Sequence, residues 1–343
     1  MIGGQARFFI RAESEDQAVE AFRYAEKEGI NLFVLGGGSN ILISDDGFDG
    51  LVLQSALKGI VIEEEPAISQ NAATSTLSGG KQVRIKAQAG EDWDQFVGYC
   101  VSRNLAGMEC LSGIPGFVGG TPVQNVGAYG QDVSETIVSV RCLDRTSGLI
   151  VELTSEDCVF GYRTSIFNTS MRDRYIVLSV TYSLLEGGPP KITYKDLKDF
   201  FSGRTPRLAE TRDAVLQIRA AKSMVIDSTD PNSRSVGSFF KNPIVSREFV
   251  AEISKKLLRA EVPHFNVDED NVKIPAAWLI ENAGFHKGFV MGNAGISTRH
   301  SLAIINRGKA RAVDILALKD KIVSAVEAKF GIILQPEPIL VGF

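Results

Sequence analysis

Residues 112–130 read SGIPGFVGGTPVQNVGAYG, and this stretch decides the fold that we expect for the chain. It holds too much glycine and proline for a regular helix, yet it is too apolar for a disordered linker. A packed, extended loop of this kind lets the backbone approach a flat ring and its diphosphate, while Gln124, Asn125 and Tyr129 supply hydrogen-bonding groups. Taken alone, the stretch also fits a buried crossover loop.

A second glycine run lies upstream, where residues 34–40 read VLGGGSN. It looks like the GxGxxG fingerprint of dinucleotide-binding folds, but that motif needs a helix directly after it, with the helix N-terminus facing the pyrophosphate. The apolar runs 32–35 and 41–43 instead predict a strand on each side. Successive backbone N–H groups of residues 36–40 can converge on a phosphate without a helix. An ordinary glycine turn remains the alternative for this run by itself.

Length and composition narrow the class of protein. With 343 residues, of which 44% are hydrophobic, the chain can bury more than one core, so two or three domains are expected. The net charge is -4 and no basic tract is interleaved with aromatic residues, so nucleic acid is not an expected partner. No apolar run approaches the roughly 20 residues that span a bilayer. The first residues lack the apolar core of a secretory signal, so we expect a cytoplasmic protein without membrane insertion.

Cysteine and histidine are too sparse for a metal centre. Cys100, Cys110, Cys142 and Cys158 form no CxxC pair, and a chain of this size needs no disulfide to hold its core, so reduced and buried thiols are expected. The three histidines have no close spacing to one another or to cysteine. We therefore expect no metal site.

Local signals outline the elements and three domains. A helix is predicted after Ser14, whose spacing to Gln17 is that of a capping box, and Gly29 ends it. Besides 32–35 and 41–43, the predicted strands are 51–53, 83–87, 137–143, 149–153, 175–184 and 332–342. The predicted helices are 92–104, 246–258, 275–283 and 309–330, and residues 194–224 have a helical, polar pattern. The polar insert 63–82 marks the first boundary. The predicted domains are 1–65, closed by the C-terminal strand 331–343, then 66–227 and 228–330.

Four further motifs follow the glycine runs in order: YRTSIF at 162–167, GSFFKNP at 237–243, AAWLI at 276–280 and LQPE at 334–337. Together they resemble the MurB family, the UDP-N-acetylenolpyruvoylglucosamine reductases, from about residue 10 to the C-terminus. The resemblance implies an α+β protein with a vanillyl-alcohol-oxidase (PCMH) type FAD-binding half, made of two α/β subdomains. A C-terminal α/β domain would bind the substrate.

The resemblance also implies the chemistry and the partners. NADPH would reduce a tightly but non-covalently bound FAD. The reduced flavin would then deliver hydride to the vinyl carbon of the enolpyruvyl ether of UDP-N-acetylglucosamine. A protein acid would protonate the adjacent carbon to give UDP-N-acetylmuramate, a peptidoglycan precursor. A monomer is expected.

Residue roles are carried over from the matched motifs. Ser238 would donate the proton, and Arg163 and Glu337 would lie beside the substrate carboxylate, where enolate charge develops. The expected cofactor-binding residues are Gly36, Gly37, Gly38, Ser39, Asn40, Ile114, Pro115, Gly116, Gly119, Gly120, Thr121, Gln124, Asn125, Gly127, Ala128 and Tyr129. The expected substrate-binding residues are Tyr194, Arg219, Lys222, Asn242, Lys287 and His300.

The sequence departs from the family pattern near its end. It has Glu337-Pro338-Ile339 where the family often has Glu-Val-Arg, and Gln335 where a second glutamate is frequent, so one positive charge is missing. The insert 63–82 has no family role that we can name. A flavin-dependent alcohol or sugar oxidase of the same superfamily is one alternative, although no histidine or cysteine is placed for covalent flavin attachment. A non-catalytic nucleotide-sugar binding protein is the other.

Overall fold

The computed structural model describes residues 2–63, 80–257 and 262–343, so most of the polar insert lies outside it. The chain divides into two compact units. The first, here the glycine-loop unit, consists of Ala6–Ser39 and Asp49–Ala220. The second, here the C-terminal unit, consists of Met1–Gln5, Asn40–Phe48 and Ala221–Phe343. The three predicted domains and their boundaries stay a prediction.

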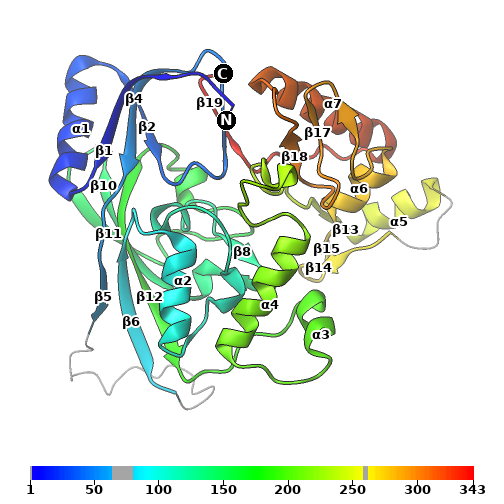
Figure 1. Cartoon of the computed structure of the whole chain (residues 1–343), viewed down its shortest axis with the longest axis horizontal. Coiled ribbons are helices and arrows are strands. Elements are labelled where there is room, and N and C mark those ends of the chain that lie inside the picture. Colours follow the sequence, from blue (N-terminus) through cyan, green and yellow to red (C-terminus); the bar gives the residue numbers. More distant parts are fainter. Residues whose placement is uncertain (1, 64–79, 258–261) are drawn as a thin grey trace. The chain divides into compact units, whose positions relative to one another are not determined.

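A small sheet opens the glycine-loop unit. Its strands are β1 (Ala6–Ala12), β4 (Phe48–Ser55) and β2 (Asn31–Leu35), in that order, with β2 parallel to β4. Helix α1 (Glu15–Glu28) lies beside them (Figure 1). The Ser14 side chain accepts a hydrogen bond from the N–H of Gln17 at 3.2 Å, and Gly29 ends the helix at a φ of 64°. The predicted start and end of this helix are confirmed.

A larger antiparallel sheet forms the main core of this unit. Its strands run in the order β11-β10-β12-β6-β5, and β7 also pairs with β12. Their bounds are β5 Ile60–Glu63, β6 Gln82–Gln88, β7 Leu105–Ala106, β10 Ile137–Asp144, β11 Ile150–Thr154 and β12 Tyr175–Glu186. Helix α2 (Trp93–Ser102) packs on the sheet. The centroid of its Phe96 ring lies 5.3 Å from the ring centroid of Tyr182 on β12. The predicted strands 83–87, 137–143, 149–153 and 175–184 and the helix over 92–104 are confirmed here.

The glycine-rich loop and two helices complete the unit. The loop region contains the 3-10 helices η1 (Glu109–Leu111), η2 (Val118–Gly120), η3 (Val133–Glu135) and η4 (Ile166–Asn168) and the short strands β8 (Gly127–Ala128) and β9 (Gln131–Asp132). The helices are α3 (Lys195–Phe201) and α4 (Leu208–Ala221). The helical pattern predicted over 194–224 is confirmed, and it is divided between these two helices. The break has a cause, since Ser202 adopts a left-handed φ of 49°, Gly203 follows at 85°, and Pro206 disfavours helix before it.

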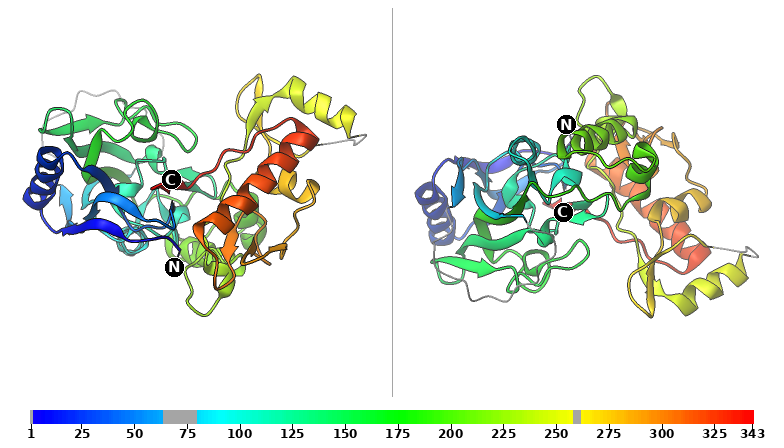
Figure 2. Two further views of the ribbon diagram at one scale, coloured as in Figure 1. Left: turned by 90° about the horizontal axis from the view of Figure 1, so that it is seen from above. Right: turned by 90° about the horizontal axis from the view of Figure 1, so that it is seen from below.

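The C-terminal unit is built around the long helix α7 (Ala312–Phe330), orange-red in Figure 2. The carboxylate of Asp45 accepts hydrogen bonds from the N–H groups of Ala312 and Val313 at 2.8 and 3.2 Å, which satisfies two donors at the start of α7. The other elements are β3 (Ile41–Ile43), η5 (Pro231–Ser233), β13 (Ile244–Ser246), α5 (Arg247–Lys256), β14 (Phe265–Asn266), β15 (Asn271–Lys273), α6 (Ala276–Asn282), β16 (Val290–Met291), β17 (Ala294–Ile296), β18 (Ile304–Asn306) and β19 (Ile339–Val341).

The C-terminal strand is shorter than predicted. Only Ile339–Val341 is strand, pairing in parallel with β3, instead of the whole stretch 332–342. Pro336 and Pro338 have no backbone N–H to donate to a ladder, which accounts for the late start.

All four cysteines are free and buried, which confirms their predicted state. Across the ranges that the structure describes, no helix has both the length and the apolar character needed to cross a bilayer.

Candidate active site

The two glycine runs predicted to bind one ligand lie in direct contact. The Ser39 hydroxyl donates a hydrogen bond to the carbonyl oxygen of Pro115 at 2.9 Å. A Cβ atom on Gly37 would stand 2.7 Å from the Cα of Gly116, closer than real side chains come, so neither loop could hold its position with a larger residue at 37. Gly116 itself has a φ of 127°, which L residues rarely adopt. The pairing of these loops requires glycine at both positions.

Part of the backbone of these two loops faces space left unfilled by the part of the protein that the structure describes. A Cβ on Gly36 or on Gly120 would meet no atom of the described residues within 4 Å, and one on Gly38 would have Leu35 as its nearest neighbour at 3.8 Å. Gly119 differs, because a Cβ there would lie 2.7 Å from that of Ala89, so packing explains it. Bare backbone facing open space is what a flat, phosphate-bearing cofactor needs. These residues therefore fit FAD.

Arg163 is fixed on the glycine-rich loop. Its guanidinium donates to the carbonyl oxygen of Asn125 at 3.2 Å, to the carboxylate of Asp132 at 3.2 Å, and to the carbonyl oxygen of Gly127. The Arg163 side chain is only 16% exposed. A Cβ on Gly127 would overlap the Asp132 carboxylate and lie 2.6 Å from the guanidinium, so this clamp needs glycine there.

Three residues of this region have left-handed backbones. The φ angles of Asn125, Tyr129 and Arg163 are 46°, 49° and 55°, although none of them is glycine. Such conformations cost energy, persist where the surroundings over-determine them, and gather at active sites and ligand clamps. All three were singled out from the sequence.

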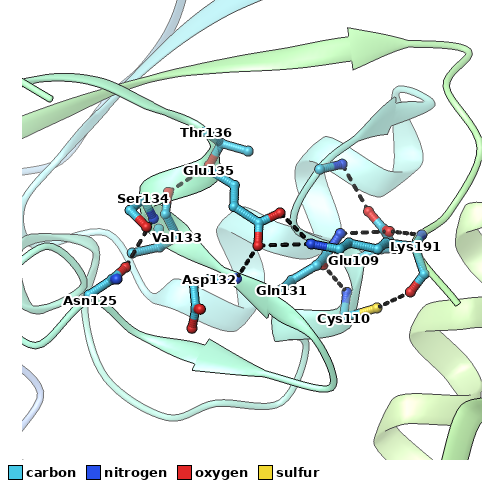
Figure 3. Close-up of polar contacts among 11 residues, drawn as sticks. Glu109, Cys110, Asn125, Gln131, Asp132, Val133, Ser134, Glu135, Thr136 and Lys191 are labelled. Atoms are coloured by element: carbon cyan, nitrogen blue, oxygen red, sulfur yellow. Dashed lines mark hydrogen bonds and ion pairs between the residues drawn. The ribbon is translucent and has the colours of Figure 1, made fainter. Parts of the chain in front are cut away.

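The side chains of two predicted cofactor ligands form hydrogen bonds with other parts of the protein. The Asn125 amide donates to the carbonyl oxygen of Gly161 at 2.9 Å. It also accepts from the N–H of Ser134 at 3.1 Å, a contact shown in Figure 3. The Thr121 hydroxyl donates to the carbonyl oxygen of Val118 at 2.8 Å and lies 3.0 Å from the Tyr182 hydroxyl. Their contact with a cofactor stays a prediction.

Tyr129, Tyr194 and Arg219 gather beside the same loop. The buried Arg219 donates to the carbonyl oxygen of Gly113 at 3.1 Å and hydrogen-bonds Tyr129, whose ring meets that of Tyr194 edge-on. Burial raises the pKa of Tyr129 to about 12, although Arg219 opposes the shift, and burial also raises the pKa of Tyr194. Both phenols therefore stay protonated near neutral pH and can donate hydrogen bonds.

In the C-terminal unit, Ser238, Glu337 and Asn40 lie on adjoining segments. Ser238 follows Gly237, whose φ is 80°, and precedes the buried Phe239. The N–H of Glu337 donates to the carbonyl oxygen of Phe239 at 2.9 Å. The Asn40 amide reaches the carbonyl oxygen of Glu337 at 3.4 Å. The chain segments of the predicted proton donor and of Glu337 are thus held side by side.

The remaining predicted substrate residues also belong to this unit. The Asn242 amide oxygen accepts from the N–H of Ala276, the first residue of α6, at 2.8 Å. His300 Nδ1 accepts from the N–H of Leu302 at 3.1 Å. Lys287 is exposed and Lys222 is half-buried. Their role in substrate binding stays a prediction.

Comparison with known proteins identifies the family. Residues 230–341 match the model described as "UDP-N-acetylenolpyruvoylglucosamine reductase, C-terminal domain", and residues 6–154 match "FAD binding domain". The UDP-N-acetylenolpyruvoylglucosamine reductase of Thermobifida fusca is 42% identical over 350 residues, covering 99% of this chain and 94% of the relative. That of Saccharopolyspora erythraea is 42% identical over 354 residues, covering 99% and 92%. This chain belongs to the UDP-N-acetylenolpyruvoylglucosamine reductase family.

The fold agrees with a solved member of the family. The reductase structure from Thermus caldophilus superposes with a TM-score of 0.60 at 22% identity and covers 97% of this chain and 91% of its own. Together with the matched FAD binding domain and the mixed helices and sheets, this confirms the expected fold class.

Sequence reasoning missed two acidic residues of this reductase-family chain. Asp132 clamps Arg163, and the only sequence signal was its capping-box spacing to Glu135, just after the glycine-rich loop. Glu109 is completely buried and hydrogen-bonded on both oxygens. Its signal was a lone charge in the apolar run Leu105 to Leu111.

Proposed function

We propose that this chain is an NADPH-dependent reductase that converts the enolpyruvyl ether of UDP-N-acetylglucosamine to UDP-N-acetylmuramate, with non-covalently bound FAD. The observation that carries the proposal is 42% identity to curated reductases over 99% of the chain. The reaction would serve peptidoglycan precursor synthesis in the cytoplasm, with the protein acting as a monomer.

The contact between the two glycine loops supports the FAD assignment. The open backbone at Gly36, Gly38 and Gly120 would hold the cofactor, and its N–H groups can face phosphate oxygens. FAD supplies hydride-transfer chemistry that no protein side chain can provide. The protein's own part is to bind the substrate, orient it and supply a proton.

Ser238 is proposed as the proton donor. In the overall reaction the substrate gains a hydride at its vinyl carbon and a proton at the adjacent carbon, while NADPH becomes NADP⁺. The Ser238 hydroxyl would give that proton and recover one from solvent. A positioned acid typically accelerates such a step by roughly a hundredfold to ten-thousandfold.

Arg163 and Glu337 are proposed to act at the substrate carboxylate, where negative charge develops. The contacts of Arg163 with Asn125, Gly127 and Asp132 support this for the arginine, because a guanidinium already held in place needs no reorganisation as charge forms. We propose Tyr194, Arg219 and Lys222 as ligands of the substrate diphosphate. The buried cation of Arg219 and the protonated phenol of Tyr194 suit an anion.

An anaerobic two-step measurement tests the function. NADPH is added to the yellow protein, the loss of flavin absorbance is followed, and then the enolpyruvyl substrate is added. The proposal expects bleaching by NADPH, return of the colour with substrate, and a product heavier than the substrate by two hydrogen atoms. A protein that takes up no FAD, or whose reduced flavin is reoxidised only by oxygen, would contradict it.

A further inference from the structure

Glu109 is a buried carboxylate that accepts three hydrogen bonds from other groups of the protein. Its exposure is 0%. One oxygen accepts from the side-chain amide of Gln131 at 2.8 Å and from the backbone N–H of Lys191 at 2.9 Å, and the other accepts from the N–H of Gly107 at 2.9 Å (Figure 3). Burying a charge is costly unless hydrogen bonds satisfy it, so these three bonds constrain three separate segments together.

Both backbone polar groups of Lys191 form hydrogen bonds, one with Glu109 and one with Cys110. Its N–H donates to Glu109, and its carbonyl oxygen accepts from the Cys110 thiol at 3.3 Å. Its ammonium also pairs with Glu135 at 2.7 Å, but these two side chains are 38% and 42% exposed. Exposed pairs contribute about 1 kcal/mol or less, so the buried contacts are the stronger anchor. Lys191 stands three residues before Tyr194, the N-cap residue that directly precedes helix α3.

The same carboxylate holds the end of the glycine-rich loop. Gln131, which donates to Glu109, accepts from the N–H of Cys110 at 2.8 Å and follows Gly130 directly. Two residues earlier, Tyr129 carries the ring that Tyr194 meets edge-on. The chain is therefore bonded to one buried acid at Gln131, two residues after Tyr129, and at Lys191, three residues before Tyr194.

We propose that Glu109 is a positioning residue for the substrate. It anchors the segment from Lys191 to Tyr194 on the glycine-rich loop and so holds Tyr194 in place before the substrate arrives. Ordering a binding segment in advance removes an entropic cost from binding. The anchoring itself follows from the contacts above, whereas its effect on substrate affinity rests on the proposed function.

Glu109→Gln is the primary test, because a carboxamide turns one acceptor oxygen into a donor that must face another N–H group. In the FAD-loaded protein without substrate, we expect faster hydrogen exchange over residues 191–201. We also expect the KM for the enolpyruvyl substrate to rise about tenfold, the loss of one good hydrogen bond. Flavin reduction by NADPH should stay within about twofold of wild type, because a substrate-positioning role leaves that step untouched.

Lys191→Met is the matched control. It removes the exposed ammonium but keeps the backbone N–H that Glu109 binds, so exchange and KM should stay within about twofold of wild type. Glu109→Asp serves if the glutamine variant does not fold. It keeps the charge but withdraws the carboxylate by about 1.5 Å, one carbon–carbon bond, and should shift exchange and KM in the same direction by a smaller amount.

Unchanged exchange over 191–201 in the Glu109 variants would overturn the anchoring. Equal effects of Lys191→Met and Glu109→Gln, or slowed flavin reduction together with the raised KM, would overturn the assigned role. Failure of the proposed function would look different: the wild-type protein would show no turnover, while the exchange difference would persist.

Discussion

The ring of Tyr194 meets the ring of Tyr129 edge-on, with 5.5 Å between the ring centroids and 88° between the planes. Tyr129 belongs to the loop proposed to hold FAD, and Tyr194, the N-cap residue of α3, is proposed to bind the substrate diphosphate. Edge-on pairs of aromatic rings stabilise each other by roughly 0.5 to 1.5 kcal/mol beyond their burial. The two proposed binding regions thus share a defined contact.

Tyr194→Phe separates this packing from the hydroxyl. The ring contact should persist, so FAD content and thermal stability should match wild type. Loss of a hydrogen bond to a charged phosphate should raise the substrate KM by about tenfold. Steady-state kinetics at fixed NADPH measure this, with Tyr24→Phe on the exposed face of α1 as the matched control. An unchanged KM would remove Tyr194 from the diphosphate site.

Gly36→Ala and Gly37→Ala should behave differently although the residues are adjacent. A Cβ at 37 would press on Gly116, so this variant should lose both thermal stability and FAD. A Cβ at 36 meets open space, so the protein alone should remain as stable as wild type and only FAD affinity should fall. Thermal midpoints before and after FAD removal, with a flavin titration, check both. Normal FAD affinity in Gly36→Ala would show that this backbone does not face the cofactor.

Structural features that depend on neighbouring residues could be predicted from the sequence, whereas contacts between distant residues could not. The cap at Ser14, the stop at Gly29 and the strand–turn–strand around Gly36 were predictable, because their residues act on their own neighbours. The contact of Gly37 with Gly116 joins two loops far apart in the chain, and no local pattern reports it. The contacts of Glu109 could not be predicted for the same reason, since two of its three donors come from residues 131 and 191.

Asp94 should make stability depend on acid pH. Its carboxylate accepts from Arg212 at 2.6 and 2.8 Å and from the N–H of Gly113, at the start of the glycine-rich loop, at 2.6 Å. Burial alone would raise the pKa of Asp94, but the hydrogen bonds from Arg212 and Gly113 outweigh burial and hold the pKa below its usual value. The stability from this carboxylate is therefore present above the unfolded pKa of about 3.9 and is lost as the pH falls through the lower folded value.

Asp94→Asn should accordingly reduce the free energy of unfolding at neutral pH by about 2 kcal/mol, the scale of a hydrogen bond to a charged group. The gap to wild type should narrow as the pH drops below about 4. Thermal midpoints across this range measure it. Asp49→Asn, which breaks the exposed pair with Arg7, should change little at any pH. A gap that is constant with pH would contradict the account of Asp94.

The central claim is that Ser238 donates the proton that saturates the enolpyruvyl ether. Ser238→Ala should keep the fold and the bound FAD, because the backbone contacts of Phe239 hold this segment without the hydroxyl. Under anaerobic conditions NADPH should bleach the variant's flavin at near the wild-type rate. Added enolpyruvyl substrate should then restore the colour at least roughly a hundredfold more slowly than in wild type. Loss of a general acid typically lowers the rate by roughly a hundredfold to ten-thousandfold. Reoxidation by substrate at the wild-type rate would contradict the claim, and a collapse of flavin reduction itself would assign Ser238 to the cofactor instead.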